Sequence, residues 1–164
     1  NDNYDLLNSH FFPALIKKIH KIKKNKVSNL TLWGNGKAKR EVLHVDDLAD
    51  ACIHVLEKWD PDDSSAPRDM NGKKLYYLNV GSEHEITIKE LAYMIAEYVE
   101  YDGEILWDTS KPDGTYRKNL DISRIKALGW EPQISLKQGI QNLVKEIEDI
   151  LDGQSNSILS LKNF

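Results

Sequence analysis

The stretch WGNGKAKREVLHVDD, residues 33–47, decides how this chain is organised. The residues that lead into it, 30–33, have the composition of a short strand, and its two glycines have the chemistry of a turn. Residues 41–45 then predict a second short extended piece, after which Asp46 or Asp47 can cap a helix. Short strands among helices are therefore expected, which is typical of a small α/β fold.

The remaining elements follow from apolar periodicity and from capping patterns. Ser9 can cap the first helix, and Thr87 with Glu90 and Ser135 with Gln138 form the capping-box patterns of two later helices. The expected helices are 11–25, one ending near 58, 88–100, a short one from 123 to a left-handed cap at Gly129, and one through 140–151, and the further extended segments are 75–80, 104–107 and 119–122.

The chain is expected to form one domain over residues 1–152, followed by a polar C-terminal tail over 153–164. Its 164 residues are 40% hydrophobic, which fits one core of ordinary size. Residues 60–74 have no apolar period and are rich in turn-forming residues, so a mobile surface loop is expected there. Because the sequence begins with Asn1 and a polar stretch, we interpret it as a piece of a longer polypeptide, a processed protein being the alternative.

Composition excludes several classes of protein. The net charge of −4 gives no positive field for duplex nucleic acid, and a mean hydropathy of −0.54 without a long apolar run excludes a membrane span. Cys52 is the only cysteine, which excludes an intrachain disulfide and a thiolate zinc site, and its helical position predicts a buried, inert thiol. We therefore expect a cytoplasmic protein with no nucleic-acid and no membrane partner.

Two polar clusters suit an anionic ligand. In the first, the glycines at 34 and 36 let a backbone approach a ligand closely, and Arg40 on the adjoining extended piece offers a fork of donors to phosphate oxygens. In the second, residues 110–118, Asp113 could accept from a sugar hydroxyl while Arg117 or Lys118 neutralises phosphate. A tight hairpin with a surface arginine and a charged surface turn are the alternatives for the two clusters. Together, in an acidic protein, they favour a small molecule that carries a polyphosphate.

A candidate for proton transfer precedes the first helix. His10 stands at the expected helix start, where an imidazole can exchange protons near neutral pH, although a histidine that only hydrogen-bonds there is the alternative. The other histidines lack metal-ligand spacing, so no metal site is expected. The sequence contains no Gly-rich dinucleotide fingerprint, no Walker lysine motif and no Tyr with a Lys four residues later behind a helper Ser.

The string G-x-G-x-x-x-R-x-x-x-H-V-D-D over residues 34–47 is similar to the substrate-domain signature of the extended short-chain dehydrogenases that act on nucleotide sugars, in the NAD-dependent epimerase/dehydratase family. More narrowly, the chain resembles the C-terminal part of the GDP-L-fucose synthases, for which the run SKPDGT at 110–115 is fairly specific. The other matching segments are NSH at 8–10, PAL at 13–15, WGNG at 33–36, RE at 40–41, LNVG at 78–81, RK at 117–118 and LGW at 128–130.

This resemblance implies a two-part enzyme. Its N-terminal Rossmann half binds NADP and would lie upstream of Asn1, whereas the small C-terminal substrate domain, short strands among helices, holds the GDP-sugar. The full-length enzyme is expected to be a homodimer that converts GDP-4-keto-6-deoxy-D-mannose to GDP-L-fucose by 3,5-epimerisation and NADPH-dependent 4-keto reduction. The chain alone is expected to be inactive.

The resemblance also implies roles for particular residues. His10 is the expected catalytic acid/base and lies near the nicotinamide, so it is also the expected cofactor contact. Lys18 stands where many members carry Arg, which turns a bidentate fork into a point charge. The expected substrate contacts are Lys18, Trp33, Arg40, Asp113 and, as a plausible addition, Lys118.

Two other functions stay open on the sequence alone. One is an epimerase or dehydratase of another nucleotide sugar, because enzymes of UDP- and dTDP-sugars share the arginine signature. The other is a stand-alone nucleotide-sugar binding module without chemistry of its own.

Overall fold

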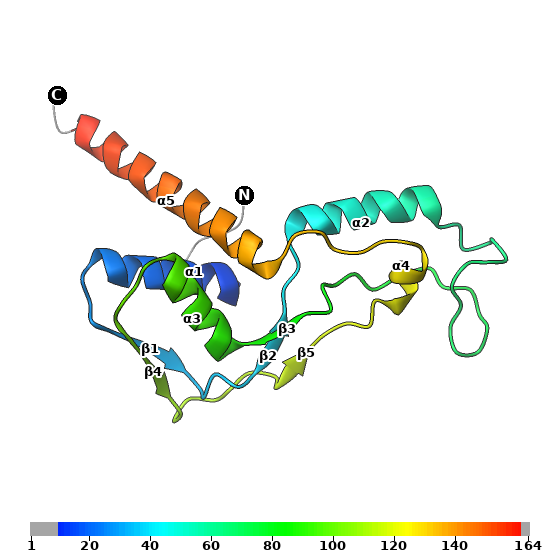
Figure 1. Ribbon diagram of the computed structural model, residues 1–164, viewed down its shortest axis with the longest axis horizontal. Helices are drawn as coiled ribbons and strands as arrows, with labels where there is room; N and C mark the ends of the chain where they lie inside the picture. Colours follow the sequence, from blue (N-terminus) through cyan, green and yellow to red (C-terminus); the bar gives the residue numbers. More distant parts are fainter. Residues whose placement is uncertain (1–9, 162–164) are drawn as a thin grey trace. The chain divides into compact units, whose positions relative to one another are not determined.

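The computed structural model describes residues 10–161, and side chains through residue 149. These residues form two compact units, each assembled from separate segments of the chain. Within the described residues, unit 1 contains 10–37, 88–114 and 137–161, and unit 2 contains 38–87 and 115–136. The helices and strands of each unit are labelled in Figure 1.

Unit 1 places helices beside a pair of parallel strands, β1 (Asn29–Trp33) and β4 (Glu104–Asp108). The amphipathic helices α1 (Phe11–Lys24) and α3 (Ile88–Tyr98) lie side by side, and α5 (Leu136–Leu161) completes the unit. Each helix turns its apolar side inward, because leucine and isoleucine recur at helical spacing. The buried side chains include Ile16, Ile19, Leu91, Ile95, Ile105 and Ile140.

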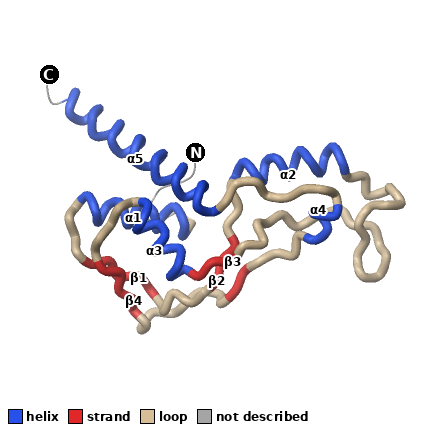
Figure 2. Tube along the Cα trace, in the orientation of Figure 1, coloured by secondary structure: helices blue, strands red, loops and turns tan. Residues whose placement is uncertain are grey.

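Unit 2 is built on a three-stranded sheet in the order β3-β2-β5. The central strand β2 (Lys39–Glu41) runs antiparallel to β3 (Glu85–Thr87) and parallel to β5 (Arg117–Lys118), and all three strands are short (Figure 2). The helices α2 (Val45–Lys58) and α4 (Ser123–Ala127) carry its core. That core consists of Ala51, Ile122, Ile125 and Trp130, with Leu43, Val55, Leu78 and Val80 packed against it.

Most of the expected elements are present. The α/β class with short strands among helices is confirmed, as are the first helix, the strands at 30–33 and 104–107, and the helix at 88–100 to within two residues. The left-handed cap at Gly129, with a φ of +91°, is also confirmed. The expected cap Ser9 lies outside the described residues; His10 is the N-cap of α1.

The helix α2 corrects the expectation of an aspartate cap. It begins at Val45 and its N-cap is His44, whose Nδ1 accepts a hydrogen bond from the Asp46 amide at 3.2 Å. Asp47, with only 4% of its surface exposed, instead accepts from the backbone amides of Gln133 and Ile134 at 3.0 Å each. The side chain that resembled a cap therefore holds a distant loop of unit 2.

Three extended segments were placed wrongly. Residues 75–80 form no strand: Leu78 and Val80 pack on the core, and the Asn79 side chain donates to Asp121 O at 3.1 Å. The strands near 41–45 and 119–122 are displaced to Lys39–Glu41 and Arg117–Lys118, and β3 was not expected at all. Pairing partners, which the sequence does not display, decide where such short strands form.

The last helix extends further than the sequence predicts. We expected its apolar period to stop near residue 151, whereas α5 continues through Leu161. In the part of the chain that the structure describes, no helix combines the length and apolar character that crossing a bilayer requires.

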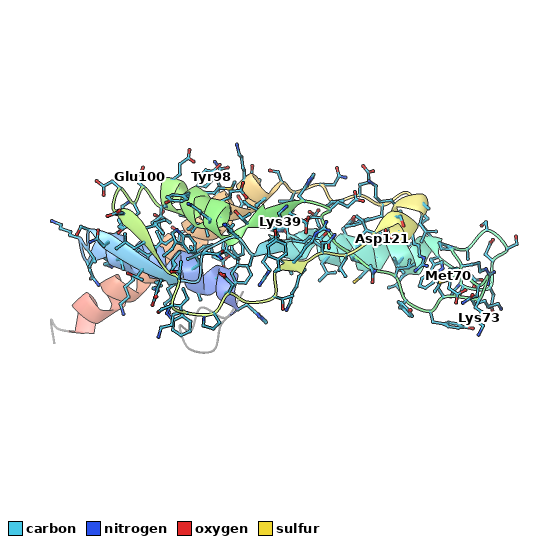
Figure 3. The ribbon with its side chains drawn as sticks, turned by 90° about the horizontal axis from the view of Figure 1, so that it is seen from below. Lys39, Met70, Lys73, Tyr98, Glu100 and Asp121 are labelled. Carbon is cyan, nitrogen blue, oxygen red and sulfur yellow. The ribbon has the colours of Figure 1, made fainter. Side chains whose placement is uncertain are left out.

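Residues 60–74 are held by local hydrogen bonds. The Lys74 ammonium forms an ion pair with the Asp62 carboxylate, which keeps the pKa of Asp62 below its usual value. The backbones of Arg68 and Lys74 form an isolated antiparallel β-bridge. Figure 3 shows Met70 and Lys73 at the far end of unit 2 from Lys39. Whether this loop is mobile stays a prediction.

Candidate functional site

In unit 1, the glycine loop of the first polar cluster is closed by Asp113 of the second. Oδ1 of Asp113 accepts a hydrogen bond from the Asn35 amide at 2.8 Å, and the Gly34 amide donates to Asp108 O at 2.9 Å. Gly34 has a φ of +79°, and a Cβ on it would meet Asp113 Oδ1 at 2.1 Å. Glycine is therefore required here both for the backbone conformation and for the close approach of the carboxylate.

Trp33 ends strand β1 beside this loop and is 69% exposed. A side chain as large and apolar as tryptophan is rarely so exposed, and the exposed indole offers a flat face to a ligand. The Lys111 ammonium lies 5.9 Å from the centre of its ring, a cation–π contact that keeps a positive charge next to that face. In the sequence Lys111 is marked only as part of the run at 110–115, and no spacing rule reveals a contact between residues 33 and 111.

In unit 2, Arg40 of the first polar cluster lies next to Lys118 of the second. The two residues are register partners in the parallel β2–β5 pair. Nη1 of Arg40 donates to Lys39 O at 2.6 Å and to Thr115 O at 2.7 Å, so two carbonyls fix this half-buried guanidinium. Among the residues that the structure describes, the Lys118 ammonium has no hydrogen-bond or ion-pair partner. Two neighbouring cations are thus available to an anion.

Of the two cations considered for phosphate, Arg117 is already engaged. Its Nε donates to the Glu85 carboxylate at 2.6 Å, across the sheet from β5 to β3. This hydrogen bond lowers the pKa of Glu85 below its usual value. Because Arg117 is paired with Glu85, Lys118 is the one of these two cations that is open to a ligand.

Glu41, which no sequence motif singled out, accepts two backbone hydrogen bonds at this sheet. Its Oε1 accepts from the Glu83 amide at 2.8 Å and its Oε2 from the Leu120 amide at 2.7 Å. No sequence signal could have found these contacts, because the partners lie 42 and 79 residues away.

The remaining candidates lie in unit 1. His10 is exposed at the N-cap of α1, where its side chain makes no capping hydrogen bond and only its carbonyl accepts, from the Ala14 amide at 3.1 Å. Nζ of Lys18 donates to Thr31 O at 3.1 Å, two residues before Trp33.

The structure therefore groups the six candidates in part. Trp33 and Asp113 flank one loop of unit 1, and Arg40 and Lys118 are paired in unit 2. The chain passes from unit 1 to unit 2 inside both polar stretches, at 37–38 and at 114–115.

One expectation about cysteine is wrong. Cys52 is exposed, because Ala51 and Val55 are the residues of α2 that face the core. Among the described residues, no group of three or more His, Cys, Asp or Glu side chains could hold a metal ion.

These features define what the residues can do chemically. Two adjacent cations suit the oxygens of a phosphate or diphosphate, an exposed indole suits a flat ring, and a carboxylate fixed through one oxygen has lone pairs left for a hydroxyl.

Comparison with known proteins indicates the class. Residues 1–71 match the model of the NAD dependent epimerase/dehydratase family. The crystal structure of a GDP-6-OMe-4-keto-L-xylo-heptose reductase from Campylobacter jejuni superposes with a TM-score of 0.76 at 30% identity, covering 91% of this chain and 50% of that one. The chain is thus similar in fold to one part of an extended short-chain dehydrogenase.

The chain is also similar in sequence to curated proteins of one enzyme type. The chain is 42% identical over 140 residues to GDP-L-fucose synthase 1 of Arabidopsis thaliana, covering 85% of this chain and 39% of that protein. It is 42% identical over 144 residues to the GDP-L-fucose synthase of Escherichia coli K12, covering 85% and 42%. The resemblance inferred from the sequence is confirmed, and the chain spans about two fifths of the length of these relatives.

Proposed function

We propose that this chain is the GDP-sugar-binding part of a GDP-L-fucose synthase. That enzyme converts GDP-4-keto-6-deoxy-D-mannose to GDP-L-fucose by epimerisation at two carbons and reduction of the ketone. The observation that carries the proposal is the pairing of Arg40 with Lys118, fixed on neighbouring strands, in a chain 42% identical to GDP-L-fucose synthases of a plant and a bacterium.

Each candidate residue has a role in this proposal. Arg40 and Lys118 neutralise the diphosphate, and the exposed indole of Trp33 provides a face for a ring of the ligand. Asp113 already uses one oxygen on the Asn35 amide, so its other oxygen accepts from a ligand hydroxyl. Lys18 adds a point charge near the end of β1.

His10 is the proposed acid/base of the epimerisation. Inverting a carbon next to a ketone requires removal of its proton and reprotonation from the other face, and a neutral imidazole can accept the first proton. The side chain of His10 makes no capping bond, which fits a group that must face substrate and nicotinamide.

NADP is the proposed cofactor, bound mainly by residues of the full-length enzyme outside this chain. NADPH supplies the hydride that reduces the ketone. The contact that this chain would offer to the nicotinamide is His10. We further propose that the full-length enzyme is a homodimer and that it is located in the cytoplasm. The proposed location is in keeping with the single cysteine of this chain, which cannot form an intrachain disulfide.

The test is a titration of the chain's tryptophan fluorescence with GDP and then with UDP at low salt. We expect GDP to change the emission more strongly than UDP, and Arg40→Ala to weaken GDP binding by about 1.5–3 kcal/mol, the contribution of a hydrogen bond to a charged group. Arg124→Ala, which removes an arginine from α4 of the same unit, is the matched control and should bind GDP like the parent chain. A folded chain that responds to neither nucleotide would refute the proposal, and a preference for UDP would favour another nucleotide sugar.

A further inference from the structure

The carboxylate of Glu41 accepts backbone hydrogen bonds just beyond the points where strand pairing in unit 2 ends. Strand β2 pairs with β3 as far as Glu41 and with β5 as far as Arg40. Beyond those points the Glu41 side chain accepts the hydrogen bonds of the flanking backbones, from the Glu83 amide before β3 and the Leu120 amide after β5. One side chain thus ties the central strand to both of its neighbours.

The backbone at Glu83 and Gly81 adopts conformations that accommodate this carboxylate. Glu83 has a φ of +59°, a left-handed conformation that is unfavourable for any residue with a Cβ. The bond to Glu41 holds its amide, and an ion pair with Lys126 at 2.7 Å holds its side chain. At Gly81 a Cβ would meet Oε1 of Glu41 at 2.3 Å, so a side chain there would displace the carboxylate.

The residues fixed in this way adjoin the two cations. Glu41 directly follows Arg40 in β2, and Leu120 lies two residues after Lys118, the register partner of Arg40. The hydrogen bond that the Leu120 amide donates to Glu41 therefore sets the spacing of the two strands next to both cations. Cations held at a fixed spacing bind a diphosphate without first losing conformational entropy.

We propose that Glu41 is a positioning residue that holds Arg40 and Lys118 at the separation that a diphosphate requires. This inference rests on the proposed function, because it assumes that the pair binds the diphosphate of a GDP-sugar. Glu41 itself is not placed on the ligand; it acts through the strands that carry the two cations.

The test is a double-mutant cycle on GDP affinity, measured by fluorescence titration of the 164-residue chain. Glu41→Gln keeps the shape of the side chain but puts an amide donor in place of one acceptor, so one of the two backbone amides loses its partner. We expect GDP to bind about tenfold more weakly to Glu41→Gln, within the range of coupling between residues of one network. In an Arg40→Ala background the same change should matter about twofold or less.

Asp47→Asn is the matched control. Asp47 is another carboxylate of unit 2 that accepts from two backbone amides, those of Gln133 and Ile134, but neither lies on the strands of the cation pair. It should lower the melting temperature about as much as Glu41→Gln and leave GDP affinity unchanged. If Glu41→Gln does not fold, Glu41→Asp, which keeps both oxygens on a shorter side chain, takes its place in the cycle.

Three results would overturn the inference while leaving the proposed function intact. The first two are an unchanged GDP affinity in the Glu41 variant and an equal loss in Asp47→Asn, which would show that stability alone matters. The third is an equal loss with and without Arg40. If the parent chain binds no GDP, the proposed function fails and the inference fails with it.

Discussion

Gly34 is a position in the loop of unit 1 at which a side chain would clash with Asp113. Since a Cβ there would meet Asp113 Oδ1 at 2.1 Å, alanine would drive Asp113 out of its hydrogen bond with the Asn35 amide. We expect Gly34→Ala to lower the free energy of unfolding by about 2 kcal/mol, roughly half from the positive φ and half from the lost bond. Urea unfolding measures this loss.

Gly72 provides the control for that substitution. Its φ of +76° is nearly the same, but a Cβ at this position would have no atom within 4 Å, so Gly72→Ala should cost only the backbone part, about 1 kcal/mol. Equal losses in the two variants would contradict the role given to Asp113.

The ion pair of Glu85 with Arg117 predicts a pH dependence. The pKa of Glu85 is lowered in the folded chain, chiefly by the hydrogen bond from Arg117, so the unfolded chain binds this proton more readily. The pair therefore stabilises the fold at neutral pH, and its contribution disappears as pH falls below about 4.3, the ordinary pKa of a glutamate, through the lower value of the folded state.

Glu85→Gln tests this dependence. At pH 7 the variant should melt at a lower temperature than the parent chain, and the difference should shrink as the pH is lowered through that window. Glu57→Gln, which removes an exposed carboxylate of α2 in the same unit, controls for the change in net charge. A difference that stays constant with pH would show that the Glu85 carboxylate contributes nothing through its ionisation.

For single residues, the sequence predicted which side chains have suitable chemistry better than it predicted their hydrogen-bond partners. Arg40 and Asp113 were chosen because their chemistry suits a phosphate and a hydroxyl, and the structure fixes both by hydrogen bonds. Glu41 was missed because its role depends on two amides far away in the sequence. A carboxylate that accepts from backbone has no signature in its own neighbourhood.

Among the elements, the long amphipathic helices were predicted well and the short strands poorly. The helices α1 and α3 each bury an apolar face with a period that a sequence window displays. The strand β5 has only two residues, Arg117–Lys118, and both are exposed, so no apolar alternation marks it. It exists because β2 lies beside it, and that is a property of the tertiary fold.

The end of helix α1 leads to a prediction about stability. Lys26 has a φ of +53°, and its amide donates to Lys23 O at 2.9 Å while the Val27 amide donates to Ile22 O at 3.0 Å. This is a Schellman motif with lysine at the position that usually holds glycine. We expect Lys26→Gly to raise the free energy of unfolding by about 0.5 kcal/mol, since relief of the left-handed strain exceeds the entropy that glycine adds to the unfolded chain.

The neighbouring Lys24 should give the opposite result. It lies in the last turn of α1, so Lys24→Gly should lower the free energy of unfolding by up to about 1 kcal/mol. The two substitutions remove the same charge and differ only in backbone conformation, and thermal melts compare them. Two changes of the same sign would show that charge, and not the φ of Lys26, decides the effect.

On the scale of the whole molecule, the class of fold was predictable and the division into units was not. Alternating strand and helix patterns indicated an α/β chain, but the segments of the two units also alternate along the sequence. The polar stretches that contain Arg40 and Asp113 are also the places where the chain changes unit. Their composition marks them as loops with chemistry and gives no sign of that second property.

The last prediction separates binding from catalysis for the chain as a whole. The chain spans about two fifths of the GDP-L-fucose synthases it matches, and its sequence has no Gly-rich dinucleotide loop. Hydride transfer requires the cofactor and the ketone to be held together, so this chain should not oxidise NADPH when given GDP-4-keto-6-deoxy-D-mannose, even if it binds GDP as proposed. NADPH absorbance over time, with a complete GDP-L-fucose synthase as the positive control, measures this. Steady oxidation by the purified chain, abolished by His10→Ala, would instead show that this chain carries a complete catalytic site.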